Sequence, residues 1–197
     1  LITEKTKAIV VVHYAGFACE MDVIMELANK HSLFVVEDAA QAIDATYKGK
    51  PLGSIGHFGT FSFHETKNII SGEGGMLVIN DEKYIERAEI IWEKGTNRSK
   101  FFRGEIDKYS WQDIGSSYLP SEITCAFLFA QLEKAKEIID ERLLIWQRYN
   151  NAFKKLNFEW LELPAIPDYA SNNGHIYFLK LHNLQSRDSF IEKMAYM

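Results

Sequence analysis

Two apolar runs separated by a helical segment restrict the fold of this chain more than any other feature. Residues 8–13 (AIVVVH) and 33–38 (LFVVED) are continuous apolar stretches, typical of strands buried on both faces. Between them, residues 21–32 (MDVIMELANKHS) repeat apolar side chains at helical spacing. A strand–helix–strand unit of this kind joins two parallel strands by a right-handed crossover. The pattern therefore predicts an α/β protein with a mostly parallel central sheet flanked by helices.

The rest of the chain continues the alternation of strands and helices. Apolar runs predict strands over 57–63, 75–80 and 175–182, and amphipathic patterns predict helices over 81–95 and 120–156. The last of these helices is long enough that we expect one break, near Ala135 or Asp140. Residues 96–118 are polar and dotted with glycine, and they predict an ordered loop of a length that is often functional.

The domain boundaries are predicted from the same patterns. We assign residues 1–130 to part of a large domain, 131–160 to a long connecting helix, and 161–197 to the start of a small C-terminal α/β domain. The chain begins in the lead-in to a strand and stops inside a helical pattern. We therefore expect it to be a piece cut at both ends from a longer protein.

Composition excludes several classes of partner. The 197 residues carry a net charge of -5, and an acidic chain repels phosphate backbones, which argues against nucleic acid. No stretch approaches the roughly 18 apolar residues of a membrane helix, and so no membrane association is expected. The two cysteines, Cys19 and Cys125, form no C-x-x-C pair, which argues against a zinc site or a disulfide framework. A reducing, cytoplasmic location fits this composition best.

Residues 61–75 (FSFHETKNIISGEGG) hold a lysine, Lys67, between two predicted strands. A lysine in a polar loop is most often a solvated surface charge. Confinement between two buried strands would remove part of its hydration, which favours the neutral and nucleophilic amine. Ser62 ends the preceding strand, where its hydroxyl would either bind a phosphate oxygen or cap the turn.

Asp38 ends a predicted parallel strand, at the edge where open α/β sheets bind their ligands. Local sequence favours an N-cap role for Asp38 at the start of a following helix. The alternative is a carboxylate that pairs with a cationic nitrogen of a ligand, while Glu37 could equally face solvent. Together with Lys67, this second reading matches the needs of an enzyme that uses pyridoxal phosphate (PLP). Such an enzyme needs a lysine amine and an acidic partner for the ring nitrogen.

The motifs resemble one known family. EDAAQA (37–42), FSFHETKN (61–68) and GEGG (72–75), followed by similar stretches over 94–123 and 130–142, are similar to the DegT/DnrJ/StrS-type sugar aminotransferases. The resemblance implies a PLP-dependent transferase of fold type I, related in fold to aspartate aminotransferase, whose large domain binds the cofactor. Within the family, HYAGFACEMD, KGTNRSKFFRG and DKYSWQDIGSSYL are most similar to the subgroup that makes dTDP-4-amino-4,6-dideoxygalactose.

The resemblance also implies roles for individual residues. Lys67 would bind PLP covalently and later move the proton between the cofactor and the sugar C4. Asp38 would pair with the pyridine nitrogen, Gln41, one helical turn on, would lie against the ring, and Ser62 would bind the phosphate. Ser117 stands where many relatives carry an asparagine that reaches the phosphate of the partner subunit in a homodimer.

The implied reaction transfers an amino group from L-glutamate to C4 of a dTDP-linked 4-keto-6-deoxy sugar, for surface polysaccharide synthesis. Three alternatives remain open. The substrate could be another nucleotide keto-sugar, aminated at C3 or linked to UDP, or the protein could be a non-catalytic PLP-binding or regulatory relative. The third is a PLP-dependent sugar dehydratase, but those enzymes carry a histidine where this chain has Lys67, which argues against it. The isolated fragment is expected to be inactive.

Overall fold

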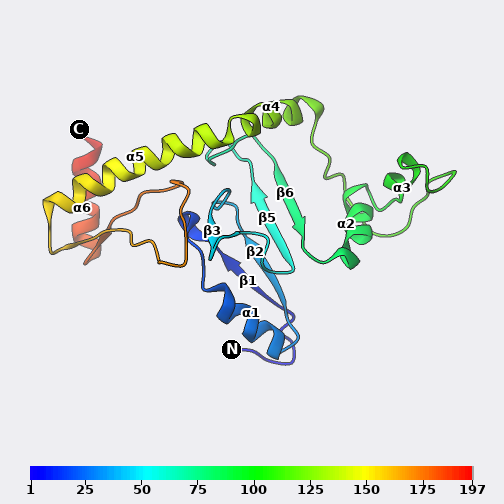
Figure 1. The fold of residues 1–197 in the computed structure, drawn as a ribbon, viewed down its shortest axis with the longest axis horizontal. Coiled ribbons are helices and arrows are strands. Elements are labelled where there is room, and N and C mark those ends of the chain that lie inside the picture. Colours follow the sequence, from blue (N-terminus) through cyan, green and yellow to red (C-terminus); the bar gives the residue numbers. More distant parts are fainter. Residues whose placement is uncertain (197) are drawn as a thin grey trace.

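A four-stranded mixed sheet forms the centre of the molecule, in a computed structural model that describes residues 1–196 (Figure 1). Its strands are β1 (Ala8–Val12), β2 (Phe34–Asp38), β5 (Phe58–Ser62) and β6 (Gly75–Ile79), in the order β1-β2-β5-β6. The first three are parallel, and β6 runs antiparallel to β5. The helix α1 (Met21–Lys30) connects β1 to β2, which confirms the predicted strand–helix–strand unit.

One face of this sheet is covered and the other is open. The core on the covered face includes Val11 and Val35, which pack with Met21 and Ala28 of α1. On the open face, Val10 keeps 65% of its surface exposed. The prediction of strands buried on both faces is therefore wrong within residues 1–196, because the described residues cover only one side.

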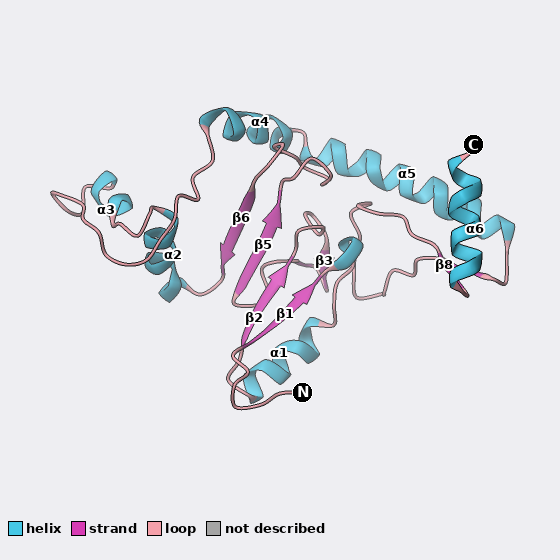
Figure 2. Cartoon of the chain, turned by 180° about the vertical axis from the view of Figure 1, so that it is seen from behind, coloured by secondary structure: helices cyan, strands magenta, loops and turns pink. Residues whose placement is uncertain are grey.

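The remaining elements surround this sheet (Figure 2). Helices α4 (Glu122–Glu133) and α5 (Ala135–Leu156) form one long helical segment that breaks at Lys134, as predicted near Ala135. The other elements are η1 (Tyr14–Gly16), β3 (Thr46–Tyr47), β4 (Lys50–Pro51), η2 (Glu82–Tyr84), α2 (Ile85–Trp92), α3 (Arg98–Phe102), β7 (Leu161–Glu162), β8 (Lys180–Leu181) and α6 (Leu184–Ala195). None of the helices in residues 1–196 combines the length and the apolar character that crossing a membrane requires.

The strand predicted over 175–182 is largely wrong. Only β8, with two residues, pairs there, against β7. Upstream of β8 the backbone is used differently: the carbonyl of Ile176 accepts a hydrogen bond from the Trp146 indole (3.1 Å), and Gly174 takes a positive φ of 64°. A segment held by side chains in this way has no free ladder of backbone groups for a neighbouring strand.

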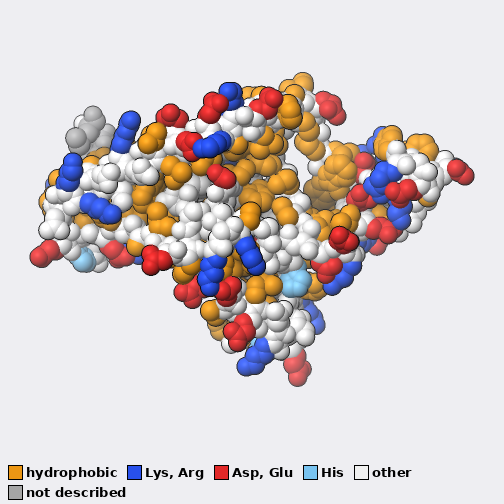
Figure 3. Space-filling view, in the orientation of Figure 1, with side chains coloured by type: hydrophobic (Ala, Val, Ile, Leu, Met, Phe, Trp, Pro, Cys, Tyr) orange, Lys and Arg blue, Asp and Glu red, His pale blue; other side chains and the backbone are white. Residues whose placement is uncertain are grey.

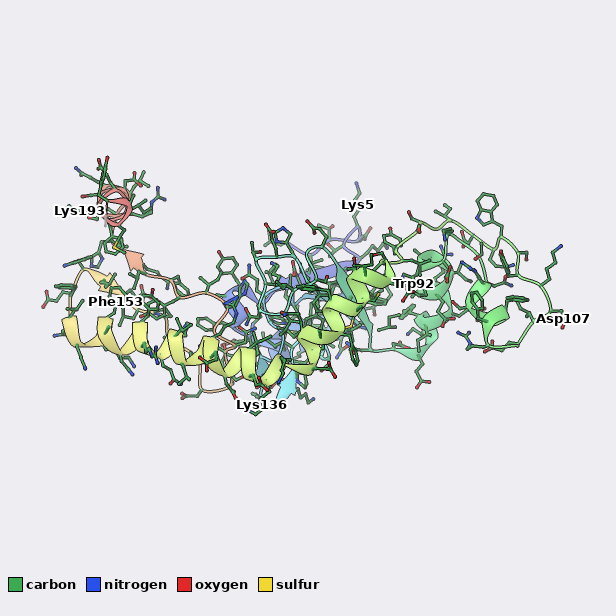
Figure 4. All side chains as sticks on the ribbon, turned by 90° about the horizontal axis from the view of Figure 1, so that it is seen from above. Lys5, Trp92, Asp107, Lys136, Phe153 and Lys193 are labelled. Carbon is green, nitrogen blue, oxygen red and sulfur yellow. The ribbon has the colours of Figure 1, made fainter. Side chains whose placement is uncertain are left out.

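The molecule is elongated, with α2 and α3 at one end and α6 at the other (Figures 1 and 4). Trp92 and Asp107 lie toward the first end, and Phe153 and Lys193 toward the second (Figure 4). Hydrophobic side chains gather along α4 on the face in view (Figure 3), and the exposed apolar residues of α4 include Phe127 and Phe129. The segment predicted as a loop over 96–118 contains the short helix α3 and is otherwise irregular.

Candidate active site

The carboxyl ends of β1, β2 and β5 meet at one edge of the sheet, and the strand register decides which side chains share a face there. Val12 pairs with Asp38, and Asp38 pairs with Thr60. Neighbours in register point to the same face of a sheet, and residues two apart do so as well. Asp38, Thr60 and Ser62 therefore lie on the open face, while Glu37 points to the covered face.

Glu37 is buried and fully engaged. Its carboxylate accepts hydrogen bonds from the backbone N–H groups of Gly53 (2.8 Å), Ile55 (2.7 Å) and Gly56 (2.6 Å), and it is 0% exposed. His13 Nε2 lies 2.9 Å from the same carboxylate. The expectation that Glu37 could face solvent is wrong. Glu37 lies two positions after Val35 on the same strand, so both side chains point to the same face. This alternation is the sequence signal that could have placed Glu37 inside.

Hydrogen bonds set the charge state of this buried pair. Burial raises the pKa of Glu37, but the hydrogen bonds from His13 and from three backbone N–H groups outweigh it and hold the pKa below its ordinary value. Burial lowers the pKa of His13, but its hydrogen bonds with Cys19 and Glu37 outweigh burial and raise the pKa to about 9, and His13 Nε2–H donates to the Glu37 carboxylate. The pair anchors the loop over 53–56 beneath the sheet edge.

Asp38 lies half-buried on the open face, and no helix follows it. Its Oδ1 accepts a hydrogen bond from the Ala40 N–H (3.0 Å), which closes a turn. The favoured N-cap reading is therefore wrong, because residues 39–45 form turns. Asp38 Oδ2 has no hydrogen-bond partner within residues 1–196. The second carboxylate oxygen is thus free for a ligand.

Gln41 lies in the same turn segment and not one helical turn beyond Asp38. Its Oε1 accepts a hydrogen bond from the Ala15 N–H (2.6 Å), and its carbonyl accepts one from Asn173 Nδ2 (2.9 Å). Gln41 therefore ties the segment after β2 to the segment after β1. Asn173 is fully buried and also donates to the carbonyl of Ile43 (2.8 Å), a contact that sequence analysis did not predict.

Lys67 lies in a tight loop between β5 and β6. The loop closes through backbone hydrogen bonds from Phe63 N–H to the Gly74 carbonyl (2.9 Å) and from Glu65 N–H to the Gly72 carbonyl (3.0 Å). Directly after Lys67, Asn68 and Ile69 are buried. The lysine is half-buried, between an exposed polar turn and these two buried residues. Its place is therefore fixed by its neighbours.

The backbone and surroundings of Lys67 are also fixed from the C-terminal side of the chain. Arg142 of α5 donates to the Lys67 carbonyl (3.3 Å). His175 Nδ1 lies 2.7 Å from Asn68 Oδ1. Burial, together with the positive charges of Lys67 and Arg142, lowers the pKa of His175 to about 4. His175, the first residue of the strand predicted over 175–182, is a neighbour of the candidate lysine.

The two serines differ in their placement. Ser62 ends β5, half-buried on the open face, and its hydroxyl accepts from the His64 N–H at 3.4 Å. Ser117 is exposed, and its backbone pairs with Glu93 at the end of α2. The structure brings Asp38, Ser62 and the Lys67 loop to one edge of the sheet. It does not place Ser117 with them.

Two arginines of the segment over 96–118 pair with neighbouring carboxylates and lie apart from the sheet edge. Arg103 pairs with Glu89 (2.7 Å) and Glu105 (2.6 Å), and Arg98 lies 3.8 Å from Glu93. A surface hollow beyond this cluster is lined by residues 111–115, and another lies along α6. Neither hollow includes the candidate residues at the sheet edge.

The mixed sheet flanked by helices, with a lysine loop after its third parallel strand, is the fold of PLP-dependent transferases of fold type I. The model of the DegT/DnrJ/EryC1/StrS aminotransferase family matches residues 1–197, and the chain belongs to this family. Members of the family are PLP-dependent sugar aminotransferases, as the sequence motifs indicated.

Three similar proteins illustrate the family. GDP-perosamine synthase of Caulobacter vibrioides is 40% identical over 91% of this chain and 45% of its own length. UDP-4-amino-4,6-dideoxy-N-acetyl-beta-L-altrosamine transaminase of Helicobacter pylori is 34% identical over 92% of this chain and 47% of its own. The PLP form of Spr1654 from Streptococcus pneumoniae superposes with a TM-score of 0.86 at 25% identity, covering 99% of this chain and 53% of that one. The chain thus spans about half the length of these proteins.

The residues at the sheet edge fit the family's cofactor. PLP carries a ring nitrogen that needs an acidic partner, an aldehyde that needs an amine, and a phosphate that needs hydrogen-bond donors. Among residues 1–196, Asp38 has a carboxylate oxygen without a partner, Lys67 carries an amine on a loop whose backbone is fixed by its neighbours, and Ser62 carries a hydroxyl. Asp38 and Ser62 end the adjacent parallel strands β2 and β5, and Lys67 lies in the loop that follows β5, at the usual ligand edge of an open sheet.

Proposed function

We propose that the protein containing this chain is an aminotransferase that moves an amino group from L-glutamate to C4 of a nucleotide-linked 4-keto-6-deoxy sugar. The observation that supports it most is the pairing, at one sheet edge, of Asp38 with a free carboxylate oxygen and a loop that fixes Lys67. A chain without chemistry at this edge would have no need for a half-buried lysine held from both sides.

Each residue has a distinct task in this proposal. When bound, PLP supplies an electron sink that stabilises negative charge on the carbon next to the transferred nitrogen. Lys67 holds the cofactor covalently between turnovers and, once its amine is free, moves the proton at that carbon. Asp38 keeps the ring nitrogen protonated, Ser62 donates to the phosphate, and Gln41 lies against the ring.

The nucleotide of the substrate is the open part of the proposal. The motifs of this chain favour dTDP-4-keto-6-deoxy-D-glucose, whereas the names of the two enzymes above point to GDP- and UDP-linked sugars. The name of the Helicobacter pylori enzyme includes a 4-amino-4,6-dideoxy sugar, which supports amination at C4. A role in surface polysaccharide synthesis would follow from such a product.

The protein's assembly and location are also proposed. We propose a cytoplasmic homodimer in which Ser117 reaches the cofactor phosphate of the partner subunit. Its exposed position, outside the edge formed by Asp38 and Ser62, is compatible with a contact across an interface. Residues 1–130 would belong to the PLP-binding domain, 131–160 to the connecting helix, and 161–197 to the small domain.

Product analysis of the full-length protein tests the proposed function. The protein is incubated with PLP, L-glutamate and a panel of dTDP-, GDP- and UDP-linked keto-sugars, and the products are identified by mass spectrometry and NMR. We expect a 4-amino sugar with wild type and no product with Lys67→Ala. Lys5→Ala removes an exposed lysine near the N-terminus, which lies at the opposite end of the sheet from the strands' carboxyl ends (Figure 1), and it serves as the matched control.

Each remaining outcome identifies a different alternative. A 3-amino product would move the reaction to C3 of the sugar. Covalent PLP binding without glutamate-dependent amination of the cofactor would indicate a non-catalytic relative. Full activity of Lys67→Ala would rule out the proposed role of this lysine.

A further inference from the structure

A chain of polar contacts links the residue after Lys67 to the C-terminal part of the molecule. Asn68 is 4% exposed, and its Nδ2 donates to the Asn173 carbonyl (2.8 Å). Its Oδ1 lies 2.7 Å from His175 Nδ1. The backbone N–H of His175 in turn donates to Asn173 Oδ1 (3.1 Å). The buried residue Asn173 therefore holds both the Asn68 side chain and the His175 backbone.

These contacts determine which nitrogen of His175 carries the proton. The Asn173 carbonyl can only accept, so the Asn68 amide must direct its NH₂ group there and its oxygen toward His175. An amide oxygen can only accept as well, so His175 Nδ1 must be the donor. In the neutral ring, the lone pair then lies on Nε2.

The surroundings of His175 keep the ring uncharged. The charged groups that act on it are Lys67, from the loop after β5, and Arg142, from α5, and both are cations. Together with burial, they lower the pKa of His175 to about 4, well below physiological pH. Within residues 1–196, no carboxylate is among the charged groups that act on His175.

We propose that Asn68 and His175 form a positioning pair for Lys67, in which Asn68 fixes His175 as the Nδ1–H tautomer so that its Nε2 is an uncharged hydrogen-bond acceptor for the lysine amine. This inference rests on the proposed function, because it assigns a task during turnover. Lys67 alternates between a covalently bound and a free state. A neutral acceptor holds the free amine without adding a third positive charge next to Arg142.

The first test observes the tautomer directly, in the cofactor-free full-length protein. Long-range ¹H–¹⁵N correlation spectra of histidine-labelled protein distinguish protonated from bare ring nitrogens, and His175→Gln assigns the signal. We expect Nδ1 protonated and Nε2 bare, with no titration between about pH 5 and pH 8, where histidine usually titrates. An Nε2–H tautomer at His175 would overturn the proposal.

A charge change at Asn68 tests whether this amide sets the state of His175. Asn68→Asp places a carboxylate against Nδ1, and we expect His175 to become cationic in the same pH range. Asn183→Asp makes the same chemical change at the N-cap of α6, where the side chain accepts from the Ser186 N–H (2.8 Å) and aspartate can do the same. We expect this control to leave His175 unchanged. An Asn68→Asp protein with His175 still neutral would contradict the pairing.

The link to Lys67 is tested with two substitutions of His175. Gln can donate to Asn68 and retain an acceptor oxygen, whereas Phe can do neither. We expect His175→Phe to lower kcat about tenfold, the size of one lost hydrogen bond to a charged group, with KM for glutamate almost unchanged. His175→Gln should recover most of this loss. In parallel, mass spectrometry measures the rate at which an amine-reactive reagent labels Lys67 in the cofactor-free protein. We expect this rate to change in His175→Phe and to stay the same in His175→Gln.

These readouts separate the positioning role from the proposed function. If no keto-sugar is aminated, the function proposed above fails, and the spectra and the labelling of Lys67 still decide whether the pair exists. Equal losses for Gln and Phe that follow a loss of thermal stability would reduce His175 to a structural residue and overturn the proposal.

Discussion

Two neighbouring carboxylates at the end of β2 have opposite surroundings. Glu37 points to the covered face, where it is 0% exposed and accepts from His13 and three backbone N–H groups. Asp38 points to the open face and is half-buried, and one of its oxygens has no partner in the described part of the chain. The difference arises from strand alternation alone, which sends successive side chains to opposite faces.

This contrast separates structure from chemistry. A carboxylate with all of its hydrogen bonds satisfied by the protein stabilises the fold and has nothing left for a ligand. A carboxylate with a free oxygen costs the protein some stability or requires solvent, and is retained where a ligand completes it. The covered face thus anchors the sheet edge, and the open face supplies the candidate site.

The largest expected effect is on stability, from Glu37→Ala. Removing the carboxylate leaves three backbone N–H groups and the His13 N–H buried without an acceptor, and we expect a loss of about 3–5 kcal/mol in the free energy of unfolding. Urea unfolding followed by circular dichroism measures it. Glu26→Ala, at an exposed position on α1, should stay within about 0.5 kcal/mol. A loss below about 1 kcal/mol for Glu37→Ala would break the contrast, since it would mean that the buried pair is dispensable.

Asp38→Asn should show the reverse pattern, with activity lost and stability kept. The amide oxygen can still accept from the Ala40 N–H, but it cannot hold a proton on a ring nitrogen by charge. We expect kcat/KM to fall by about 10²–10³, the usual effect of losing one preorganised electrostatic contact. Asp44→Asn, at an exposed residue with φ of 63° that asparagine also tolerates, is the control. Undiminished turnover in Asp38→Asn would remove this residue from the site.

The acid stability of the protein should depend on Glu37 as well. Its pKa is lowered on folding, so its stabilisation is complete above the unfolded pKa of about 4.3 and is lost as pH falls through the folded value. We expect the wild-type protein to lose stability on acidification more steeply than Glu37→Gln. Urea midpoints measured at decreasing pH compare the two proteins. Parallel curves would show that Glu37 does not change its proton affinity on folding.

The smallest effects compare two valines of β1. Val11→Ala, on the covered face at 9% exposure, should cost about 1–2 kcal/mol, because it removes two buried methyl groups. Val12→Ala, on the open face at 47% exposure, should cost less than about 0.5 kcal/mol. Thermal or urea unfolding resolves the difference. Equal losses would show that the open face is packed in solution.

Much of the fold follows from local patterns. The apolar runs of β1 and β2, the amphipathic spacing of α1 and the break of the long helix near Ala135 all reflect periodicity within one segment. Predictions that needed a partner segment were less successful. The strand over 175–182 was wrong because the segment is held by side chains, including Trp146, and the N-cap role of Asp38 was wrong because turns follow it.

The sequence by itself determined the parallel strand–helix–strand unit, the family motifs and the identity of the candidate lysine and aspartate. Only the tertiary structure decided that Glu37 is buried while Asp38 is free, that Ser117 lies apart from the sheet edge, and that Asn68 and His175 meet beside Lys67. The physical reason is the distance along the chain over which each kind of interaction acts. Periodicity and turn chemistry act over a few residues, whereas the hydrogen bond between Asn68 and His175 joins side chains 107 positions apart.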